Sequence, residues 1–293
     1  MRKVLKWIGI VLGGLIGLLV IAIGVVSVIG SQKLSNSQPY QVSETFTAPT
    51  SPEAVARGQY LVNSTTGCFG CHGDGAKGQI LIDGLPVGTL PAPNLTAGKG
   101  GIGGSMTDAD WNRAIRHGIG HDGRVLAIMP ADHFNHMSDA DLGAVVAYIK
   151  SLPPVDNVLP ARSLALPADA LVGAGVFSLP AENINHSAPH PANVTPAETA
   201  DYGSYVVELA GCSECHGENL TGQSGGGGPA APNISPTGEV GAWTRQQFFT
   251  TIRTGVTPAG HQLTDDMPWK TFKNMTDTDL GAVYAYLHSL PAR

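Results

Sequence analysis

Aromatic residues, cysteines and basic residues are all scarce in this chain of 293 residues. Phe, Trp and Tyr make up 6% of the sequence, and there are only four cysteines. Beyond Lys33 the chain keeps 13 of its 17 basic residues and all 23 acidic residues, a formal charge of −10. This acidic balance argues against nucleic acid as a partner. Small modules with so few aromatic side chains would have thin cores unless another apolar group is buried in them.

All four cysteines fall in two copies of the pattern Cys-x-x-Cys-His, at residues 68–72 and 212–216. This is the attachment pattern of c-type haem. Two thiols at this spacing can add to the two vinyl groups of one haem, and the next histidine then lies under the iron. The sequence therefore predicts two covalently bound haem c groups, each containing iron. The predicted attachment residues are Cys68, Cys71, Cys212 and Cys215, and the predicted proximal iron ligands are His72 and His216.

Two other interpretations of the cysteine pairs remain open. A Cys-x-x-Cys pair can be a redox dithiol or half of a zinc site. A thioredoxin-like dithiol would need alternating strands and helices, which this sequence does not predict. A four-cysteine zinc site would need both pairs to converge across the intervening chain. Neither interpretation explains the histidine after each pair or the Met-Pro downstream of each pair.

An apolar run without charge occupies residues 8–29. Its 22 residues, at about 1.5 Å each, are enough to cross a bilayer core of roughly 30 Å. Arg2, Lys3 and Lys6 precede the run and predict that the rest of the chain lies on the outer side. A cleaved signal peptide is the alternative, although its apolar region is usually about 7–15 residues long. We expect an uncleaved anchor over residues 1–30.

The remainder of the chain consists of two copies of one sequence repeat. The order of landmarks is the same in both copies, which predicts a duplicated domain at residues 53–155 and 197–293. A tether, residues 31–52, precedes the first copy, and a linker, residues 156–196, separates the two. The paired landmarks are Gly58-x-Tyr60 and Gly203-x-Tyr205, Pro93-Asn94 and Pro232-Asn233, Ile115-Arg116 and Ile252-Arg253, Met129-Pro130 and Met267-Pro268, and Ser151-Leu152-Pro153 and Ser289-Leu290-Pro291.

Capping residues predict three main helices in each copy, with a haem loop after the first and a methionine loop before the last. The glycine-rich stretch at residues 225–228 is expected to be a loop over a haem. The predicted fold is therefore all-α. In the second copy, Thr195-Pro196-Ala197-Glu198 resembles a capping box, and we expect a helix from there to about Leu209. The other predicted caps are Ser51, Thr107, Ser138, Thr244 and Thr276.

At this level of detail, each copy resembles a class I cytochrome c domain. The run from Pro93-Asn94-Leu95-Thr96 to Met129-Pro130 is similar to the cytochrome c subunits of membrane-bound alcohol and sugar dehydrogenases. The resemblance covers about residues 53–155 and 197–291. Those subunits usually carry three haem domains and a C-terminal anchor, whereas this sequence shows two haem domains and an N-terminal anchor.

The resemblance implies a role for several pairs of residues. Met129 and Met267 would be the distal iron ligands, and the prolines Pro93 and Pro232 would lie behind the proximal histidines. A nearby backbone carbonyl could fix each imidazole there. The tyrosines and tryptophans of the remaining pairs are expected in the core or at a haem edge, and the arginines at haem propionates or in solvent. These pairs are Tyr60 with Tyr148 and Tyr205 with Tyr286 at helix crossings, Trp111 and Trp243 at the middle helices, and Arg116 and Arg253.

The distal ligands have rivals in both copies. Met129 competes with four nearby histidines, so bis-histidine ligation of the first haem remains open. These histidines are otherwise expected on a polar loop surface. Met267 competes with Met275 and His261, and Met275 is expected to pack in the core. The four histidines are His117, His121, His133 and His136.

Together these features predict a dihaem electron carrier, not an enzyme, anchored in a cell membrane with its haem domains on the outer, periplasmic side. It would pass single electrons within a respiratory chain. The expected partners are a dehydrogenase or quinol-oxidising complex on one side and a terminal oxidase or soluble cytochrome on the other. A dihaem cytochrome c peroxidase or sulfur-compound dehydrogenase is the alternative, and it would need one iron with an open or unusual coordination site. A subunit of a larger complex would differ only in its partners.

Overall fold

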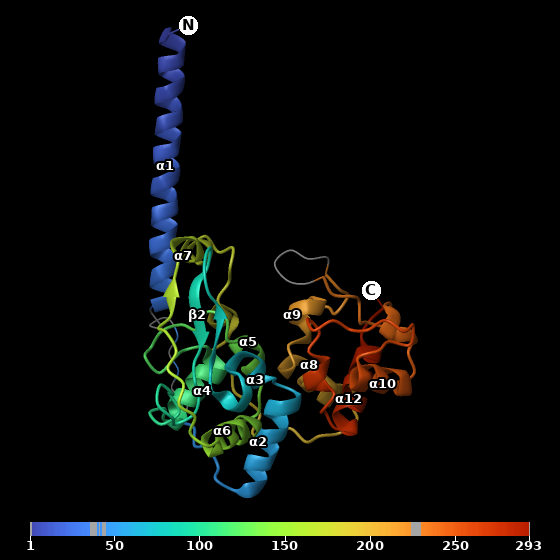
Figure 1. Ribbon diagram of the computed structural model, residues 1–293. Helices are drawn as coiled ribbons and strands as arrows, with labels where there is room; N and C mark the ends of the chain where they lie inside the picture. The colour runs from blue at the N-terminus through green and yellow to red at the C-terminus, as the bar shows by residue number, and fades with distance from the viewer. Residues whose placement is uncertain (1, 36–39, 41, 43–44, 224–229, 293) are drawn as a thin grey trace.

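The computed structural model of the protein describes residues 2–35, 40, 42, 45–223 and 230–292. Figure 1 shows a long helix, α1, that projects from one helical lobe, with a second lobe beside the first. The first lobe contains the elements α2 to α7, and the second contains α8 to α12. The elements are α1 (Arg2–Ser35), α2 (Pro52–Ser64), α3 (Cys68–His72), β1 (Gln79–Ile82), β2 (Gly88–Ala92), α4 (Asp108–His117), α5 (Ala131–Phe134), α6 (Asp139–Ser151), β3 (Ser163–Leu164), α7 (Leu166–Gly173), α8 (Ala200–Leu209), α9 (Cys212–His216), α10 (Arg245–Thr254), α11 (Trp269–Phe272) and α12 (Asp277–Ser289).

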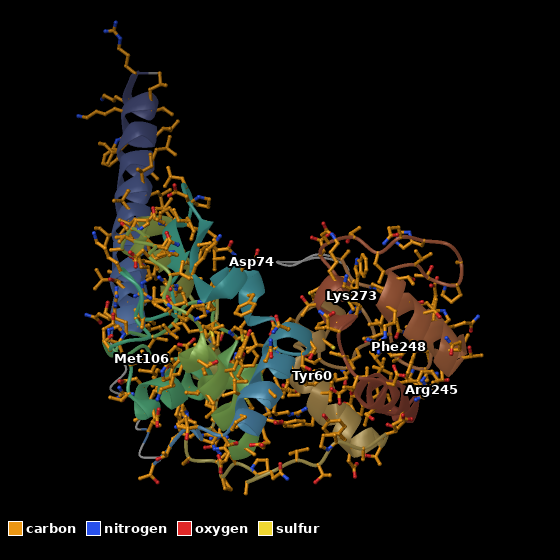
Figure 2. All side chains as sticks on the ribbon, turned by 60° about the horizontal axis from the view of Figure 1, so that its bottom comes forward. Tyr60, Asp74, Met106, Arg245, Phe248 and Lys273 are labelled. Atoms are coloured by element: carbon orange, nitrogen blue, oxygen red, sulfur yellow. The ribbon has the colours of Figure 1, made fainter. Side chains whose placement is uncertain are left out.

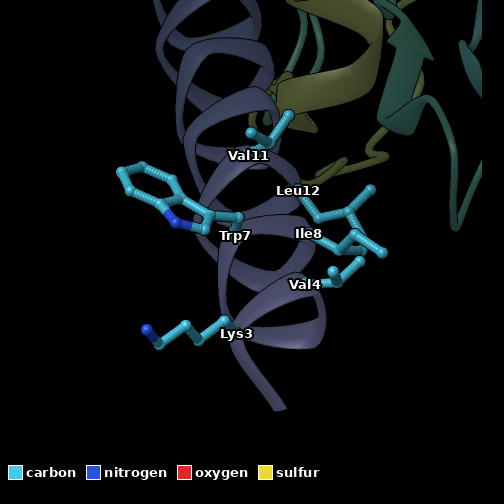
Figure 3. A pocket seen from close by; sticks show the side chains of 6 residues that line it. All are labelled: Lys3, Val4, Trp7, Ile8, Val11 and Leu12. Carbon is cyan, nitrogen blue, oxygen red and sulfur yellow. The ribbon is translucent and has the colours of Figure 1, made fainter. Parts of the chain in front are cut away.

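The helix α1 contains the apolar run and continues to Ser35, beyond the predicted end of the anchor. Its apolar side chains face outward along most of its length. Figure 3 shows Trp7 on one side of the first turns, Ile8 and Leu12 on the other, and Lys3 at the start. Among the described residues, α1 is the one helix whose length and composition would allow it to cross a membrane.

The first lobe is built on a close crossing of α2 and α6. Gly58 lies at the crossing, where a Cβ atom would overlap the carbonyl oxygen of Ala144, so the approach requires glycine. Ser51 and Ser138 cap the two helices as predicted. The core beneath the crossing is formed mainly by Leu61, Trp111, Ile115, Phe134, Met137, Leu142, Val145 and Ile149.

The second lobe repeats this crossing with α8 and α12. Gly203 takes the place of Gly58, and a Cβ atom there would overlap the carbonyl oxygen of Ala282. Thr244 and Thr276 cap α10 and α12 as predicted. Met275 is 4% exposed and packs in the core, also as predicted. The duplication seen in the sequence is therefore a duplication of local structure.

The first helix of the second lobe starts later than predicted. The hydroxyl oxygen of Thr199, not that of Thr195, accepts the backbone N–H bond that caps α8. A capping box at Thr195 would need the carboxylate of Glu198 for its own backbone. That carboxylate instead accepts two hydrogen bonds from Arg245, at 2.8 and 2.9 Å. A tertiary ion pair therefore overrides the local capping pattern.

The prediction of an all-α fold is wrong in one respect, because β1, β2 and β3 form a small antiparallel sheet in that order. Gln79 pairs with Ala92 between β1 and β2, and Gly88 pairs with Leu164 between β2 and β3. The third strand comes from the segment expected to be a linker. Pairing across such a sequence distance leaves no local pattern, so the sequence analysis did not find it.

The segment between the two copies packs against the first lobe and against α1. Figure 1 shows α7 beside the base of α1. The two helices touch through Gly30 and Gly173, and a Cβ atom at either would overlap the backbone of the opposite helix. Lys33 forms an ion pair with Glu182 at 2.8 Å, and a guanidinium nitrogen of Arg162 donates to the carbonyl oxygen of Leu34 at 3.2 Å. The anchor helix and the first lobe are thus joined by several direct contacts.

The two lobes meet where the first helix of each lobe, α2 or α8, faces the opposite lobe. Figure 2 shows Tyr60 at this boundary. The hydroxyl of Tyr60 donates to the carboxylate of Asp279 in the second lobe. Its oxygen accepts the backbone N–H of Thr276 at 2.9 Å. Tyr60 was expected to be an ordinary core residue of its own copy. Its ring does pack against the first core, but its hydroxyl reaches the start of α12.

Tyr205 makes the reciprocal contacts. Its hydroxyl donates to the carboxylate of Asp141 at 2.7 Å, and its oxygen accepts the backbone N–H of Ser138 at 3.1 Å. Each lobe therefore supplies a tyrosine hydroxyl to the first turn of the last helix in the other lobe. Each acidic residue is also held from within its own lobe, Asp141 by Arg57 at 2.9 Å and Asp279 by Tyr202 at 2.8 Å.

Candidate haem-binding sites

The first candidate site is organised by the short helix α3. Gly67 precedes it with a φ of 58°, a left-handed conformation that glycine adopts without strain. Cys68 and Cys71 lie three residues apart on this helix, so their side chains share one face. His72 is the last residue of α3 and is buried. The geometry thus presents two thiols and an imidazole from a single helical turn.

The ring of His72 is fixed by a backbone carbonyl. Its Nδ1 lies 2.9 Å from the carbonyl oxygen of Pro93. A carbonyl can only accept, so Nδ1 carries the hydrogen and Nε2 keeps its lone pair. Burial lowers the pKa of His72, and the bond to Pro93 offsets part of that effect. The neutral ring is the form that binds a metal ion.

A cavity of about 310 Å³ adjoins these groups. Its volume falls within the range of roughly 300–1,000 Å³ that ligand sites occupy. Cys68, Cys71, His72 and Met129 all contribute to its wall. Apolar side chains from β1, β2, the loop after β2, α4 and α6 form much of the rest, among them Leu81, Leu90, Leu95, Trp111, Ile115, Val145 and Ile149. Two thiols, a histidine and a methionine around an apolar cavity fit a covalently bound haem.

The four rival histidines of the first copy have different surroundings. Only His121 lines the cavity. His117 is fully buried, with its Nδ1 3.0 Å from Nδ1 of His186. His136 is exposed and lies 3.7 Å from a carboxylate oxygen of Glu208. The expectation of a polar loop surface is therefore wrong for His117.

His133 is also buried, and it bridges the two lobes. Its Nδ1 donates to Glu208 at 3.1 Å and its Nε2 to Glu214 at 2.7 Å. Burial alone would lower the pKa of His133, but the bonds to these two carboxylates raise that pKa to about 10. Glu214 lies between the two cysteines of the second copy. His133 therefore links the methionine loop of one lobe to the cysteine motif of the other.

The second candidate site repeats the first. Gly211 precedes α9 with a φ of 64°. The Nδ1 atom of His216 lies 2.7 Å from the carbonyl oxygen of Pro232. Met267 and Cys212 both pack against the second core. The glycine-rich loop expected over this site, residues 225–228, lies outside the described residues.

Burial disfavours the thiolate form of all four cysteines. It raises the pKa of Cys68, and it raises the pKa of Cys212 to about 12. A catalytic dithiol needs the opposite shift, toward the thiolate. The described residues also contain no group of three His, Cys, Asp or Glu side chains arranged to hold a metal ion. The raised thiol pKa values weigh against the dithiol interpretation.

Arg116 and Arg253 have structural partners that the sequence analysis missed. A guanidinium nitrogen of Arg116, which is 1% exposed, donates to the carbonyl oxygen of Met137 at 2.7 Å and pairs with Asp139 at 2.8 Å. Arg253 pairs with Asp277 at 2.8 Å in the same way. Both arginines fasten the start of the last helix of their lobe. Neither is the freely solvated residue that was one of the two expectations.

Two glutamines brace the cysteine motifs, and they too were missed. The side-chain amide of Gln79 donates to the carbonyl oxygen of Gly70 at 2.7 Å. Gln223 donates to the carbonyl oxygen of Glu214 at 2.9 Å. Each glutamine follows the second cysteine of its motif by eight residues. This equal offset is a signal that the repeat already contained.

Two family models match the chain, one in each copy. Residues 53–149 match cbb3-type cytochrome c oxidase subunit III, and residues 200–291 match cytochrome c. The chain belongs to the cytochrome c family. The cytochrome carries two covalently bound haem c groups, in agreement with the two domains and with a dihaem relative.

Several relatives share most of the cytochrome's length. It is 30% identical to the fructose dehydrogenase cytochrome subunit of Gluconobacter japonicus over 86% of its own residues and 56% of the relative. It is 28% identical to the alcohol dehydrogenase (quinone) cytochrome c subunit of Gluconacetobacter polyoxogenes, over 81% of its own residues and 56% of the relative. It is also 28% identical to a dihaem c-type cytochrome of Cereibacter sphaeroides, over 77% of its own residues and 82% of the relative. The chain thus spans about half the length of the two dehydrogenase subunits.

Proposed function

We propose that this cytochrome is a membrane-anchored electron carrier that accepts single electrons from a dehydrogenase. The observation that carries the proposal is the repeated His–carbonyl pair, His72 with Pro93 and His216 with Pro232. In each lobe this bond engages Nδ1, so that Nε2 of the same imidazole would be available to hold an iron. The names of the dehydrogenase relatives support the nature of the donor. A terminal oxidase or soluble cytochrome would accept the electrons.

The four cysteines would hold the haems, and each iron would lie between a histidine and a methionine. Haem c supplies a one-electron iron couple, and methionine ligation raises its reduction potential. His72 and Met129 would hold the iron of the first lobe, and His216 and Met267 would hold that of the second. With a methionine as the second ligand, neither iron would keep an open position for a substrate. This arrangement supports a carrier over a peroxidase.

The helix α1 would place the haem lobes at the outer surface of the membrane. Its apolar residues are exposed along the segment that a bilayer core would cover. Lys3 at its start, with Arg2 and Lys6, would remain on the cytoplasmic side. The haem lobes would then lie in the periplasm, where a membrane-bound dehydrogenase could reach them.

Methionine variants of the full-length protein test the proposed ligands. Met129→Ala should lower one reduction potential and remove about half of the weak sulfur-to-iron absorption band, because only the first iron would lose its sulfur ligand. Met267→Ala should do the same at the other haem. Met275→Leu is the matched control, because Met275 packs in the core and its variant should leave the band unchanged.

Two results would contradict the proposal. If Met129→Ala leaves the band intact while His121→Ala changes the spectrum, the first haem has two histidine ligands. If the unmodified protein binds cyanide rapidly at one iron, that iron has an open site and the protein is an enzyme.

A further inference from the structure

The segment that follows β3 exposes an apolar surface with almost no charge. Residues 164–179 contain one ionisable side chain, that of Asp169. Four large apolar side chains in this segment are exposed rather than packed inward. They are Leu166 (59% exposed), Leu171 (43%), Val176 (73%) and Phe177 (41%).

The turn between β1 and β2 extends this surface. Leu85 in that turn is 85% exposed. The backbone N–H of Ala165 donates to the carbonyl oxygen of Val87 at 2.9 Å, which holds the turn against the start of α7. We call Leu85, Leu166, Leu171, Val176 and Phe177 together the α7 patch. It joins two segments that lie about 80 residues apart in the sequence.

The α7 patch lies beside the point where α1 would leave the bilayer. A core of roughly 30 Å takes about 20 helical residues, so a span that starts at Ile8 ends near residue 28. The contacts with α7 fall at this level. The hydroxyl of Ser27 donates to the carbonyl oxygen of Leu166 at 3.3 Å, and Gly173 lies against the carbonyl of Val26.

We propose that α7 and the adjoining β1–β2 turn form a second membrane contact, in which the α7 patch enters the headgroup region of the outer leaflet. The inference rests on the proposed anchor, because the depth of α7 is set by its contacts with α1. Exposed apolar surface beside a polar lobe is typical of helices that lie in the plane of a membrane. The contact would hold the first haem lobe at a fixed height and tilt above the lipid.

Thiol accessibility tests this contact in the full-length protein. The native cysteines are all used by the haems, so Val176→Cys introduces a single free thiol. Val158→Cys is the matched control, since Val158 is 67% exposed. The side-chain amide of the preceding residue, Asn157, donates to the carbonyl oxygens of Lys77 and Gly78, next to the end of the hairpin opposite Leu85. Both variants are placed in phosphatidylcholine nanodiscs and alkylated with a charged, water-soluble maleimide.

We expect the thiol at residue 176 to react about tenfold more slowly than that at residue 158, because apolar surroundings disfavour the reactive thiolate. Discs that contain a diazirine phospholipid should also give cross-links within residues 164–177 and none at residue 158. These two results together would establish the lipid contact.

Three outcomes would overturn it. Equal alkylation rates without cross-links, in a protein that resists carbonate extraction, would leave the anchor in place and remove the second contact. Protection seen only in native membranes would assign the α7 patch to a protein partner. Release of the protein by carbonate would show that the anchor itself is absent.

Discussion

At the scale of single residues, His133 makes the two lobes unequal. The corresponding place in the second lobe is held by Thr271, and Glu208 and Glu214 correspond to Asn63 and Gly70 in the first. The charged bridge therefore exists on one side of the boundary only. It ties the cysteine motif of the second lobe to the methionine loop of the first. The electrostatic field around the cysteine motif of the second lobe thus differs from that around the motif of the first.

The bridge at His133 should make the stability of the protein depend on pH. Its folded-state pKa, about 10, lies above the ordinary value of about 6.5. The bonds of His133 to Glu208 and Glu214 thus contribute fully to the free energy of unfolding below pH 6.5. This contribution is lost as the pH rises through 10. His133→Thr, which copies the second lobe, should be less stable by about 1–3 kcal/mol at pH 6.

Thermal unfolding followed by circular dichroism from pH 6 to pH 10 measures this difference. The gap between the native protein and the variant should narrow as the pH rises. A gap that stays constant across this range would show that His133 is not charged in the folded protein.

The sequence was informative for residues whose role is local. The motif, most of the capping residues and the core position of Met275 could be predicted because a few neighbouring residues determine their chemistry. Tyr60, Arg116 and His133 could not be predicted, since their partners lie 21 to 219 residues away. Tyrosine, arginine and histidine are residue types that occur in cores, at solvent-exposed surfaces and in loops. Only the folded chain brings these three residues to their partners.

At the scale of secondary-structure elements, competition for a side chain decides where α8 begins. Thr195 has every neighbour that a capping box needs, yet Arg245 takes the carboxylate of Glu198. The helices with undisputed caps begin where the sequence predicted. The sheet also depends on a distant partner that local sequence does not reveal. The strand β3 pairs with a strand about 75 residues earlier and has no sequence pattern of its own.

The two threonines before α8 should differ in their effect on stability. Thr199→Ala removes the side chain that caps α8 and should lower the free energy of unfolding by about 1 kcal/mol. Thr195→Ala, the matched control, should change it by a few tenths at most. Denaturant unfolding of both variants measures the difference. The reverse order of effects would mean that the helix begins at the earlier threonine.

At the scale of the whole molecule, the exchanged tyrosines couple the two lobes. Replacing both Tyr60 and Tyr205 with Phe keeps the rings and removes the hydroxyls that reach across the boundary. Each lost hydrogen bond should cost about 0.5–1.5 kcal/mol. We therefore expect the double variant to unfold in two resolved calorimetric transitions, where the native protein unfolds in one.

Tyr284→Phe provides the control for this experiment. The hydroxyl of Tyr284 donates to the carbonyl oxygen of Trp243 at 3.0 Å, within the second lobe. Its loss should weaken that lobe without separating the transitions. A double variant that still unfolds in a single transition would mean that other contacts, such as those of His133, suffice to couple the lobes.

The reciprocal use of Tyr60 and Tyr205 also bears on how such a chain could arise. Each tyrosine contacts the same two positions, a helix cap and the acidic residue three places later, in the other copy. A surface that meets its own equivalent in this way is isologous, as in a symmetric homodimer. Two separate copies of one ancestral domain could have made the same contacts. The tandem repeat then corresponds to a homodimer whose subunits were fused. The bridge at His133 is an asymmetry that two identical subunits could not have.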